Sequence, residues 1–382
     1  MRIYLDHNAS TPVREEAADA MAAALRERFG NPSSVHAEGA AARAEVERAR
    51  ERLAELLACR PREVLFTAGA TEANNTALGP LLRAWAGARR HLISSNAEHP
   101  SVEEPLAALE REGWRVTRLP VAPDGLLDPE ALAAAIGPET ALLTLLWANN
   151  ETGVVQPMAR LAALARERGV RVHADATQCL GKLPVDLEAV PLDALSLSAH
   201  KLGGPKGVGA LVARGEADFE ALLRGGPQER RRRGGTENVP GIVGLGVAAA
   251  LATRELSERS REYARLRDRL WDGITAKIPR VRRNGAEAAL LCNTLSVEFE
   301  GVAGELLMQA LDLDGIAVST GAACASGRVE PSHVLLAMGR SARQARASLR
   351  FSVGHGVDDP QIERVLARLP DLVARVREAG EA

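Results

Sequence analysis

Apolar runs of strand length alternate with helical stretches in the first half of the chain, and this alternation restricts the fold more than any other feature. The runs show little polar alternation and cover residues 64–67, 91–95, 114–119, 141–147, 170–174, a stretch through Leu195 and Leu197, and 209–212. Helical spacing marks residues 71–85, 101–112, 132–136 and 161–168. Strands buried on both faces and joined by helices form βαβ units. The sequence therefore predicts an α/β fold with a mostly parallel sheet and helices on both faces.

The two ends of the chain follow other patterns. Two more helices are predicted at 15–29 and 37–58, separated by turn formers. A helical stretch rich in arginine and glutamate, 247–278, precedes strand-like runs at 293–299, 316–319 and 348–353. Because 382 residues are too many for one small core, we expect a large domain of residues 13–256 and a smaller α+β domain made of 1–12 and 257–382.

The composition is that of an ordinary globular protein. Hydrophobic residues make up 46%, charged residues 26%, and the net charge is -2, so nothing attracts the whole chain to nucleic acid or an anionic membrane. The N-terminal residues turn polar early and the apolar runs are too short to cross a bilayer. We therefore expect a cytoplasmic protein that contacts neither nucleic acid nor membrane directly.

The cysteines are few and widely spaced. Cys59, Cys179, Cys292 and Cys324 form no C-x-x-C pair, which argues against a disulfide framework, a local metal site and a cluster-binding scaffold. A free cysteine is usually a small core residue, and we expect this of the first three. Cys324 differs because it lies in a run of small residues, 318–327, with little reason to be buried.

Lys201 is the residue on which the chemistry converges. Only four of the 48 basic residues are lysines, so the chain strongly favours arginine. Arginine cannot replace lysine where an amine is needed. Arginine stays protonated, whereas a desolvated lysine can lose its proton and form a Schiff base with an aldehyde. Lys201 ends an apolar strand as Ser-x-His-Lys, followed by Gly-Gly-Pro-Lys-Gly. A lone lysine at the end of a strand is usually a solvated charge, so the surrounding residues must decide between this interpretation and a reactive amine.

Polar residues follow several other predicted strands. Thr71 stands between a strand and a helix, where it indicates either an anion site or an ordinary N-cap. His99 and Asp175 also come directly after strands, and parallel sheets bind ligands at their strands' carboxyl ends. Asn150 fits a plain turn equally well, and the charge run 229–233 fits a solvated surface.

In their order along the chain, these motifs resemble the class V aminotransferase family of pyridoxal-phosphate enzymes, most closely its NifS/IscS-like cysteine desulfurases with the longer catalytic loop. The similarity extends from Tyr4-Leu5-Asp6 to Leu349-Arg350-Phe351-Ser352. It implies the fold type I of pyridoxal-phosphate-dependent transferases. It also implies pyridoxal 5'-phosphate as the cofactor, with Lys201 as its anchor.

The resemblance implies roles for further residues. The implied cofactor-binding residues are Ala70, Thr71, His99, Asn150, Asp175, Gln178, Ser198, His200, Lys201 and Thr236. Asp175 would accept a hydrogen bond from the protonated pyridine nitrogen, Gln178 would donate one to the ring's phenolic oxygen, and His99 would stack on the ring. Thr236 would reach the phosphate of a neighbouring subunit, which implies a homodimer. The implied substrate-binding residues are Asn31, Asn150 and Arg350, the last as a bidentate carboxylate clamp.

The segment around Cys324 resembles the mobile catalytic loop of these desulfurases, and the Arg-x-Gly-x-His-Cys pattern of the shorter-loop branch is absent. Lys201, His99 and Cys324 are then the catalytic residues. The implied reaction converts L-cysteine to L-alanine and leaves a persulfide on Cys324, whose sulfur passes to an iron–sulfur scaffold or another acceptor protein. No metal site is expected beyond a transient contact of Cys324 with an iron–sulfur cluster.

Other reactions on the same scaffold stay open. They are selenocysteine cleavage, cysteine sulfinate cleavage and transamination. Cys324 discriminates the last of these, because a transaminase needs no thiol.

Overall fold

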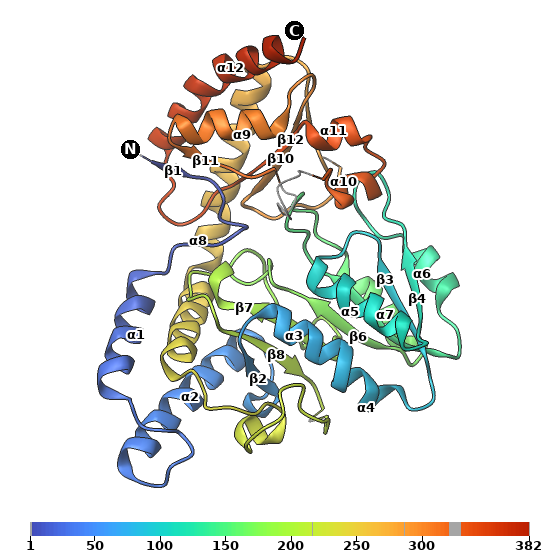
Figure 1. The fold of residues 1–382 in the computed structure, drawn as a ribbon, viewed down its shortest axis with the longest axis vertical. Helices are drawn as coiled ribbons and strands as arrows, with labels where there is room; N and C mark the ends of the chain where they lie inside the picture. The colour runs from blue at the N-terminus through green and yellow to red at the C-terminus, as the bar shows by residue number, and fades with distance from the viewer. Residues whose placement is uncertain (1, 216, 286, 321–329, 382) are drawn as a thin grey trace.

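A seven-stranded sheet forms the centre of the computed structural model, which describes residues 2–215, 217–285, 287–320 and 330–381 (Figure 1). The strand order is β2-β8-β7-β6-β5-β3-β4. The strands are β2 (Val64–Thr67), β3 (His91–Ser95), β4 (Arg115–Leu119), β5 (Thr140–Leu146), β6 (Arg171–Asp175), β7 (Ala194–Ser198) and β8 (Gly209–Ala213). β8 pairs antiparallel with β2 and β7, and every other pair of strands in this sheet is parallel. The prediction of a mostly parallel sheet is confirmed.

Helices cover both faces of the sheet, as predicted. Their bounds are α1 (Glu15–Glu27), α2 (Ala37–Leu56), α3 (Ala70–Thr76), α4 (Leu82–Ala86), α5 (Pro100–Arg111), α6 (Pro129–Ala135), α7 (Met158–Glu167) and α8 (Val239–Lys277). On β5, Leu143 joins the core beneath α2, α7 and α8, whereas Leu142 packs with α4 and α5. Neighbouring residues of one strand thus face opposite layers, which explains the continuous apolar runs in the sequence.

The helix predicted at 71–85 exists but contains an irregular turn. Its parts α3 and α4 are joined without a break by a π-helical turn, Ala77–Leu81, which contains Pro80. Proline has no N–H group for the regular helical hydrogen bond, so a widened turn is a natural place for it. Residues 70–86 therefore form one helical run whose N-terminus faces the carboxyl end of β2.

The second part of the molecule lies at the top of Figure 1. It contains the antiparallel sheet β12-β10-β9 and the parallel pair β1-β11. The bounds are β1 (Ile3–Tyr4), β9 (Val281–Arg283), β10 (Thr294–Phe299), β11 (Ile316–Ala317), β12 (Ser348–Ser352), α9 (Gly304–Leu313), α10 (His333–Ala337), α11 (Ala342–Arg346) and α12 (Asp359–Glu381). The sequence patterns predicted strands in this part but neither α9 nor α12.

Helix α8 links the two parts and is longer than predicted. It has 39 residues and begins at Val239 instead of Val247. The missed turns contain glycines that lie against α1 and α2; a Cβ on Gly246 would come within 2.7 Å of Ala49. Close helix packing has overridden the low helix propensity of glycine here.

Helix α8 also passes between two hydrophobic cores. Its residues as far as Ala252 belong to the core of the large sheet, and those from Tyr263 onward belong to the core around β10 and β12. Ile3 belongs to this second core. These memberships support the predicted boundary near residue 257, which stays a prediction. Among the described residues, α8 alone has the length and hydropathy of a membrane span, but 61% of its most apolar window is buried within the protein. It is a core helix.

Candidate active site

A cavity of about 780 Å³ opens where β2, β5, β6 and β7 end. Nine of the ten residues predicted to bind the cofactor line it: Ala70, Thr71, His99, Asn150, Asp175, Gln178, Ser198, His200 and Lys201. They come from segments spread over more than 130 residues of sequence, and the parallel strands bring them together because their carboxyl ends share one edge.

Lys201 ends a short 3-10 turn, Ala199–Lys201, directly after β7. Its Nζ donates hydrogen bonds to the carbonyl oxygens of Asn8 at 2.6 Å and Ala9 at 2.8 Å. Burial lowers the pKa of Lys201 to about 8, with a further contribution from the Arg350 guanidinium. A much larger fraction of this amine is therefore neutral near physiological pH than for an exposed lysine.

Asp175 is the last residue of β6 and is 2% exposed. Its carboxylate accepts hydrogen bonds from Asn74 Nδ2 at 2.8 Å and from the Thr177 backbone N–H at 3.0 Å. The buried Thr177 hydroxyl, which belongs to the cavity lining, has no hydrogen-bond partner. The cavity floor therefore presents a fixed anion beside a hydroxyl that is free to bond.

His99 is the N-cap residue of α5. Its Nδ1 accepts from the Ser101 backbone N–H at 3.1 Å, so the ring's proton is carried by Nε2 when the side chain is neutral. Burial lowers the pKa of His99, while nearby Asp175 acts in the opposite direction and Lys201 adds to the lowering. The ring is thus held in one orientation and in its neutral form.

One end of the cavity is rich in hydrogen-bond donors. The N-terminus of the helical run 70–86 lies there with Thr71, and Ser198, His200 and Lys206 complete this part of the lining. Free N–H groups at a helix N-terminus bind anions. The region therefore has the donor set that a phosphate group requires.

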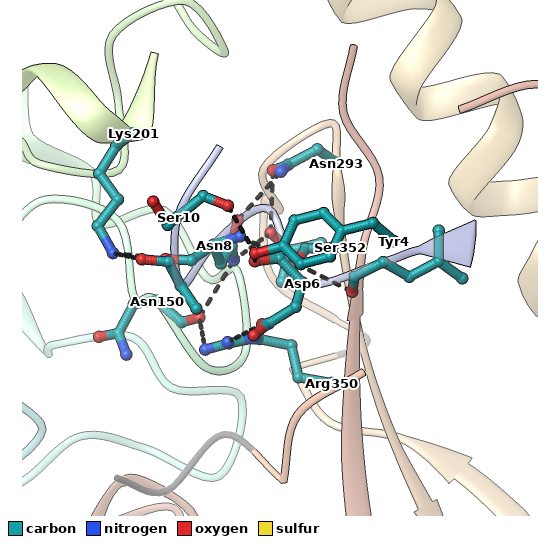
Figure 2. A network of polar contacts seen from close by, with 12 residues as sticks. Tyr4, Asp6, Asn8, Ser10, Asn150, Lys201, Asn293, Arg350 and Ser352 are labelled. Carbon is teal, nitrogen blue, oxygen red and sulfur yellow. Dashed lines mark hydrogen bonds and ion pairs between the residues drawn. The ribbon is translucent and has the colours of Figure 1, made fainter. Parts of the chain in front are cut away.

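Arg350 lies beside the cavity and is joined to it through Asn150. The guanidinium donates to the Asn150 carbonyl oxygen at 2.9 Å and pairs with Asp6 Oδ1 at 2.6 Å. It is 4% exposed, and its Nε has no partner. Figure 2 shows the guanidinium directed toward Asn150 and Asp6.

Two further predicted site residues also lie outside this cavity in the single chain. Thr236 is exposed and lines a smaller cavity of about 130 Å³, which shares Ala68 and Gly207 with the first. Asn31 is exposed in the turn between α1 and α2. Cys324 lies outside the described residues.

The run 230–233 is not a uniformly solvated charge face. Arg232 is 6% exposed and donates to the Arg62 carbonyl oxygen at 3.0 Å, and Arg233 pairs with Glu72 at 3.0 Å. Preceding them, Glu229 is buried in a bidentate pair with Arg50. The run anchors the segment that carries Thr236.

Several buried polar residues of the site were not predicted from the sequence. Asn74 supports Asp175, and Lys182 donates to Gln178 Oε1 at 2.5 Å. Asn8 accepts hydrogen bonds from both Lys201 and Gln178. No sequence pattern marks these residues, because each lies among turn or helix residues of ordinary composition and is important only through distant partners.

Comparisons with known proteins agree with this geometry. The family profile described as Aminotransferase class-V matches residues 3–365. A cysteine desulfurase of Cereibacter sphaeroides is 47% identical over 378 residues, covering 98% of this chain and 97% of that protein. The IscS-like cysteine desulfurase of Mycobacterium tuberculosis is 44% identical, with 99% and 98% covered.

Solved structures are similar over the same length. A NifS-like protein superposes with a TM-score of 0.92 at 35% identity, covering 98% of this chain and 100% of that one. The structure described as SspA in complex with cysteine has a TM-score of 0.81 at 35% identity, with 92% and 99% covered. The chain therefore belongs to the class-V aminotransferase family, which uses pyridoxal phosphate, and within it to the NifS- and IscS-like cysteine desulfurases.

Proposed function

We propose that this protein is a pyridoxal-phosphate-dependent cysteine desulfurase that releases L-alanine and leaves the sulfur as a persulfide on Cys324. One observation carries the proposal. Lys201, with its lowered pKa, shares a single cavity with the Asp175 carboxylate, the neutral His99 ring and a phosphate-type donor set. Such a combination suits a cofactor with an aldehyde, a basic ring nitrogen and a phosphate.

The cavity residues fit the cofactor at each of its polar groups. The N-terminus of the helical run 70–86, with Thr71, Ser198 and His200, would hold the phosphate. Asp175 would accept a hydrogen bond from the ring nitrogen, and the Thr177 hydroxyl near Asp175 is unpartnered. His99 would cover one face of the ring, Gln178 would donate to the phenolic oxygen, and Lys201 would supply the amine.

Pyridoxal phosphate, when bound, supplies an electron sink for carbanion chemistry at the substrate's α-carbon. This chain's residues do the rest. Arg350 and Asn150 would hold the substrate carboxylate, because the buried guanidinium has an unpartnered Nε and is fixed by Asp6. Lys201 would move the α-proton, since burial keeps its pKa at about 8.

Sulfur transfer requires a nucleophile. The thiolate of Cys324 would attack the substrate sulfur, so that an S–S bond forms while the substrate's C–S bond breaks. The electron pair of the broken bond stays with the carbon fragment, which takes up a proton and leaves as alanine. The complex of SspA with cysteine, at 35% identity, supports cysteine as the substrate.

The proposal includes a homodimer and a sulfur acceptor. Thr236 and Asn31 lie outside the cavity of their own chain, and a second copy could bring Thr236 to the phosphate end. Phe29 and Val35, on either side of Asn31, are 77% and 95% exposed, which supports burial of this turn in an interface. An iron–sulfur scaffold or another protein would receive the sulfur from Cys324, in the cytoplasm.

The test is to load the purified protein with pyridoxal phosphate, add L-cysteine, and measure alanine together with the mass of the Cys324 peptide. Alanine formation with one added sulfur on that peptide is the expected result. Selenocysteine and cysteine sulfinate are assayed in parallel. A preference for either of them, or alanine without persulfide, contradicts the proposal.

A further inference from the structure

Asn8 is a buried asparagine with an unusually complete set of partners. It lies four residues after β1, is 1% exposed, and takes part in seven hydrogen bonds through its backbone N–H, backbone carbonyl, Oδ1 and Nδ2. Figure 2 shows it at the centre of the polar network between the two parts of the molecule. A saturated buried asparagine of this kind fixes the position of every group that it contacts.

On the cavity side, the Asn8 carbonyl oxygen accepts from Lys201 Nζ at 2.6 Å and from Gln178 Nε2 at 2.9 Å. The neighbouring Ala9 carbonyl accepts a second hydrogen bond from Lys201 at 2.8 Å. The position of the lysine amine is therefore set by the backbone of residues 8 and 9.

On the opposite side, Asn8 Nδ2 donates to the Asn150 carbonyl oxygen at 3.1 Å. That same oxygen accepts from Arg350 Nη1 at 2.9 Å. Further hydrogen bonds tie Asn8 to the strands of the small sheet: Nδ2 to Thr294 of β10 at 2.8 Å, and the backbone N–H to Ser352 of β12 at 3.0 Å. Arg350 lies on β12, two residues from Ser352, so Asn8 is joined to the arginine by two routes.

We propose that Asn8 is a positioning residue that fixes the distance between the Lys201 amine and the Arg350 guanidinium. This inference rests on the proposed function, which gives these two groups their roles toward an α-amino acid. In such a substrate the carboxylate and the α-proton are joined to one carbon. A displacement of either group therefore misplaces the proton whenever the carboxylate is held.

The side chain of Asn8 touches neither substrate nor cofactor in this scheme. It acts through Asn150 and Arg350, which would hold the carboxylate, so its effect on binding depends on whether the ligand has a carboxylate. We expect Asn8→Ala to weaken binding of L-alanine to the loaded enzyme by about tenfold. Binding of ethylamine, which lacks the carboxylate, should change by less than about twofold. Both affinities follow from titrations of the bound cofactor's absorbance.

A matched control is available in the small sheet. Asn284 is also buried, and its Nδ2 makes two hydrogen bonds, to Ser296 and Ser348, neither of which is a hydrogen-bond partner of Asn8. Asn284→Ala should leave the ratio of the two affinities unchanged. In an Arg350→Ala background, Asn8→Ala should no longer discriminate between the ligands. Equal weakening of both ligands, or discrimination that persists without Arg350, overturns the proposal.

A measurement on the apo-protein separates this inference from the proposed function. The unfolding free energies of Asn8→Ala, Arg350→Ala and the double variant should not be additive, because both side chains bond to the same Asn150 carbonyl. Additive effects overturn the proposal. If coupling is found but the wild type makes no alanine from cysteine, the placement by Asn8 stands and the proposed function falls. Asn8→Ser, which keeps a short polar side chain, serves if Asn8→Ala does not fold.

Discussion

The cavity and the seam between α8 and α12 contain many charged residues but use them differently. At the seam, Arg265 pairs with both Glu262 and Asp359. The side chain of Arg265 is 46% exposed and that of Asp359 is 39% exposed. At the cavity, Asp175 is buried and Lys201 is half-buried, and the Thr177 hydroxyl beside Asp175 lacks a partner. Charged side chains that are exposed and fully paired are typical of a protein surface. Buried polar groups that lack a hydrogen-bond partner are typical of a ligand-binding site.

Lys201→Ala gives the largest expected effect and tests the cavity side of the comparison. No cofactor should remain attached after borohydride reduction, and alanine formation from cysteine should fall to background. The measurement is peptide mass mapping of the protein after borohydride reduction. Lys277→Met is the control, because Lys277 is exposed at the end of α8 and does not line the cavity. Cofactor found attached to Lys182 in the Lys201→Ala variant would contradict the assignment of Lys201.

Cys324→Ser extends the comparison to thiols. Burial raises the pKa of Cys59 to about 12 and also raises the pKa of Cys179 and Cys292, so these three stay protonated and poorly nucleophilic. We expect cysteine turnover to fall by roughly 10²-fold or more, while cysteine still binds. Cys292→Ser should retain turnover. Added sulfur on the Cys292 peptide of the wild type would contradict the assignment.

Asp175→Asn removes the buried charge without removing its volume. A neutral amide no longer favours a protonated ring nitrogen, so we expect loss of about 2.7 kcal/mol of transition-state stabilisation, roughly 10²-fold in rate. Cofactor loading should persist. Stopped-flow measurement of the first turnover tests this, and a wild-type rate would show that the anion is structural only.

The pH dependence of cofactor capture tests the lowered pKa of Lys201. The protonated amine cannot attack an aldehyde, so the capture rate of the apo-protein should rise with pH and level off above about 8. Below that pH, each unit should cost about tenfold. A rate that keeps rising to pH 10 would mean that Lys201 is solvated like a seam residue.

Arg265→Ala gives the smallest expected effect. Exposed ion pairs contribute little, because water and salt screen them. We expect the melting temperature to change by no more than about 2 °C and alanine formation to stay at the wild-type rate. A large fall in activity would show that the ion pairs of the seam are energetically coupled to the cavity.

The sequence predicted the large sheet well because most of its strands, such as β5 and β8, are buried along their whole length and mainly apolar. The edge strand β4 is the exception. The sequence also located the cavity residues that directly follow strands, such as His99 and Asp175. It did not predict the first turns of α8, where glycine packing against α2 outweighs propensity, nor α9 and α12. Asn8 escaped notice for a related reason: its partners Lys201 and Asn150 are 193 and 142 positions away, and no local pattern encodes them.

The continuity of α8 limits how this chain can change in length. An α-helix turns by about 100° per residue, so one residue inserted between Ala252 and Tyr263 would rotate one end of α8 relative to the other. The face that packs in the core of the large sheet and the face that packs near β10 could then not both be seated. Insertions, deletions and chain breaks at this point should be selected against, even though it separates two cores. Fusion or circular permutation would succeed better in the exposed turn around Gly113, between α5 and β4.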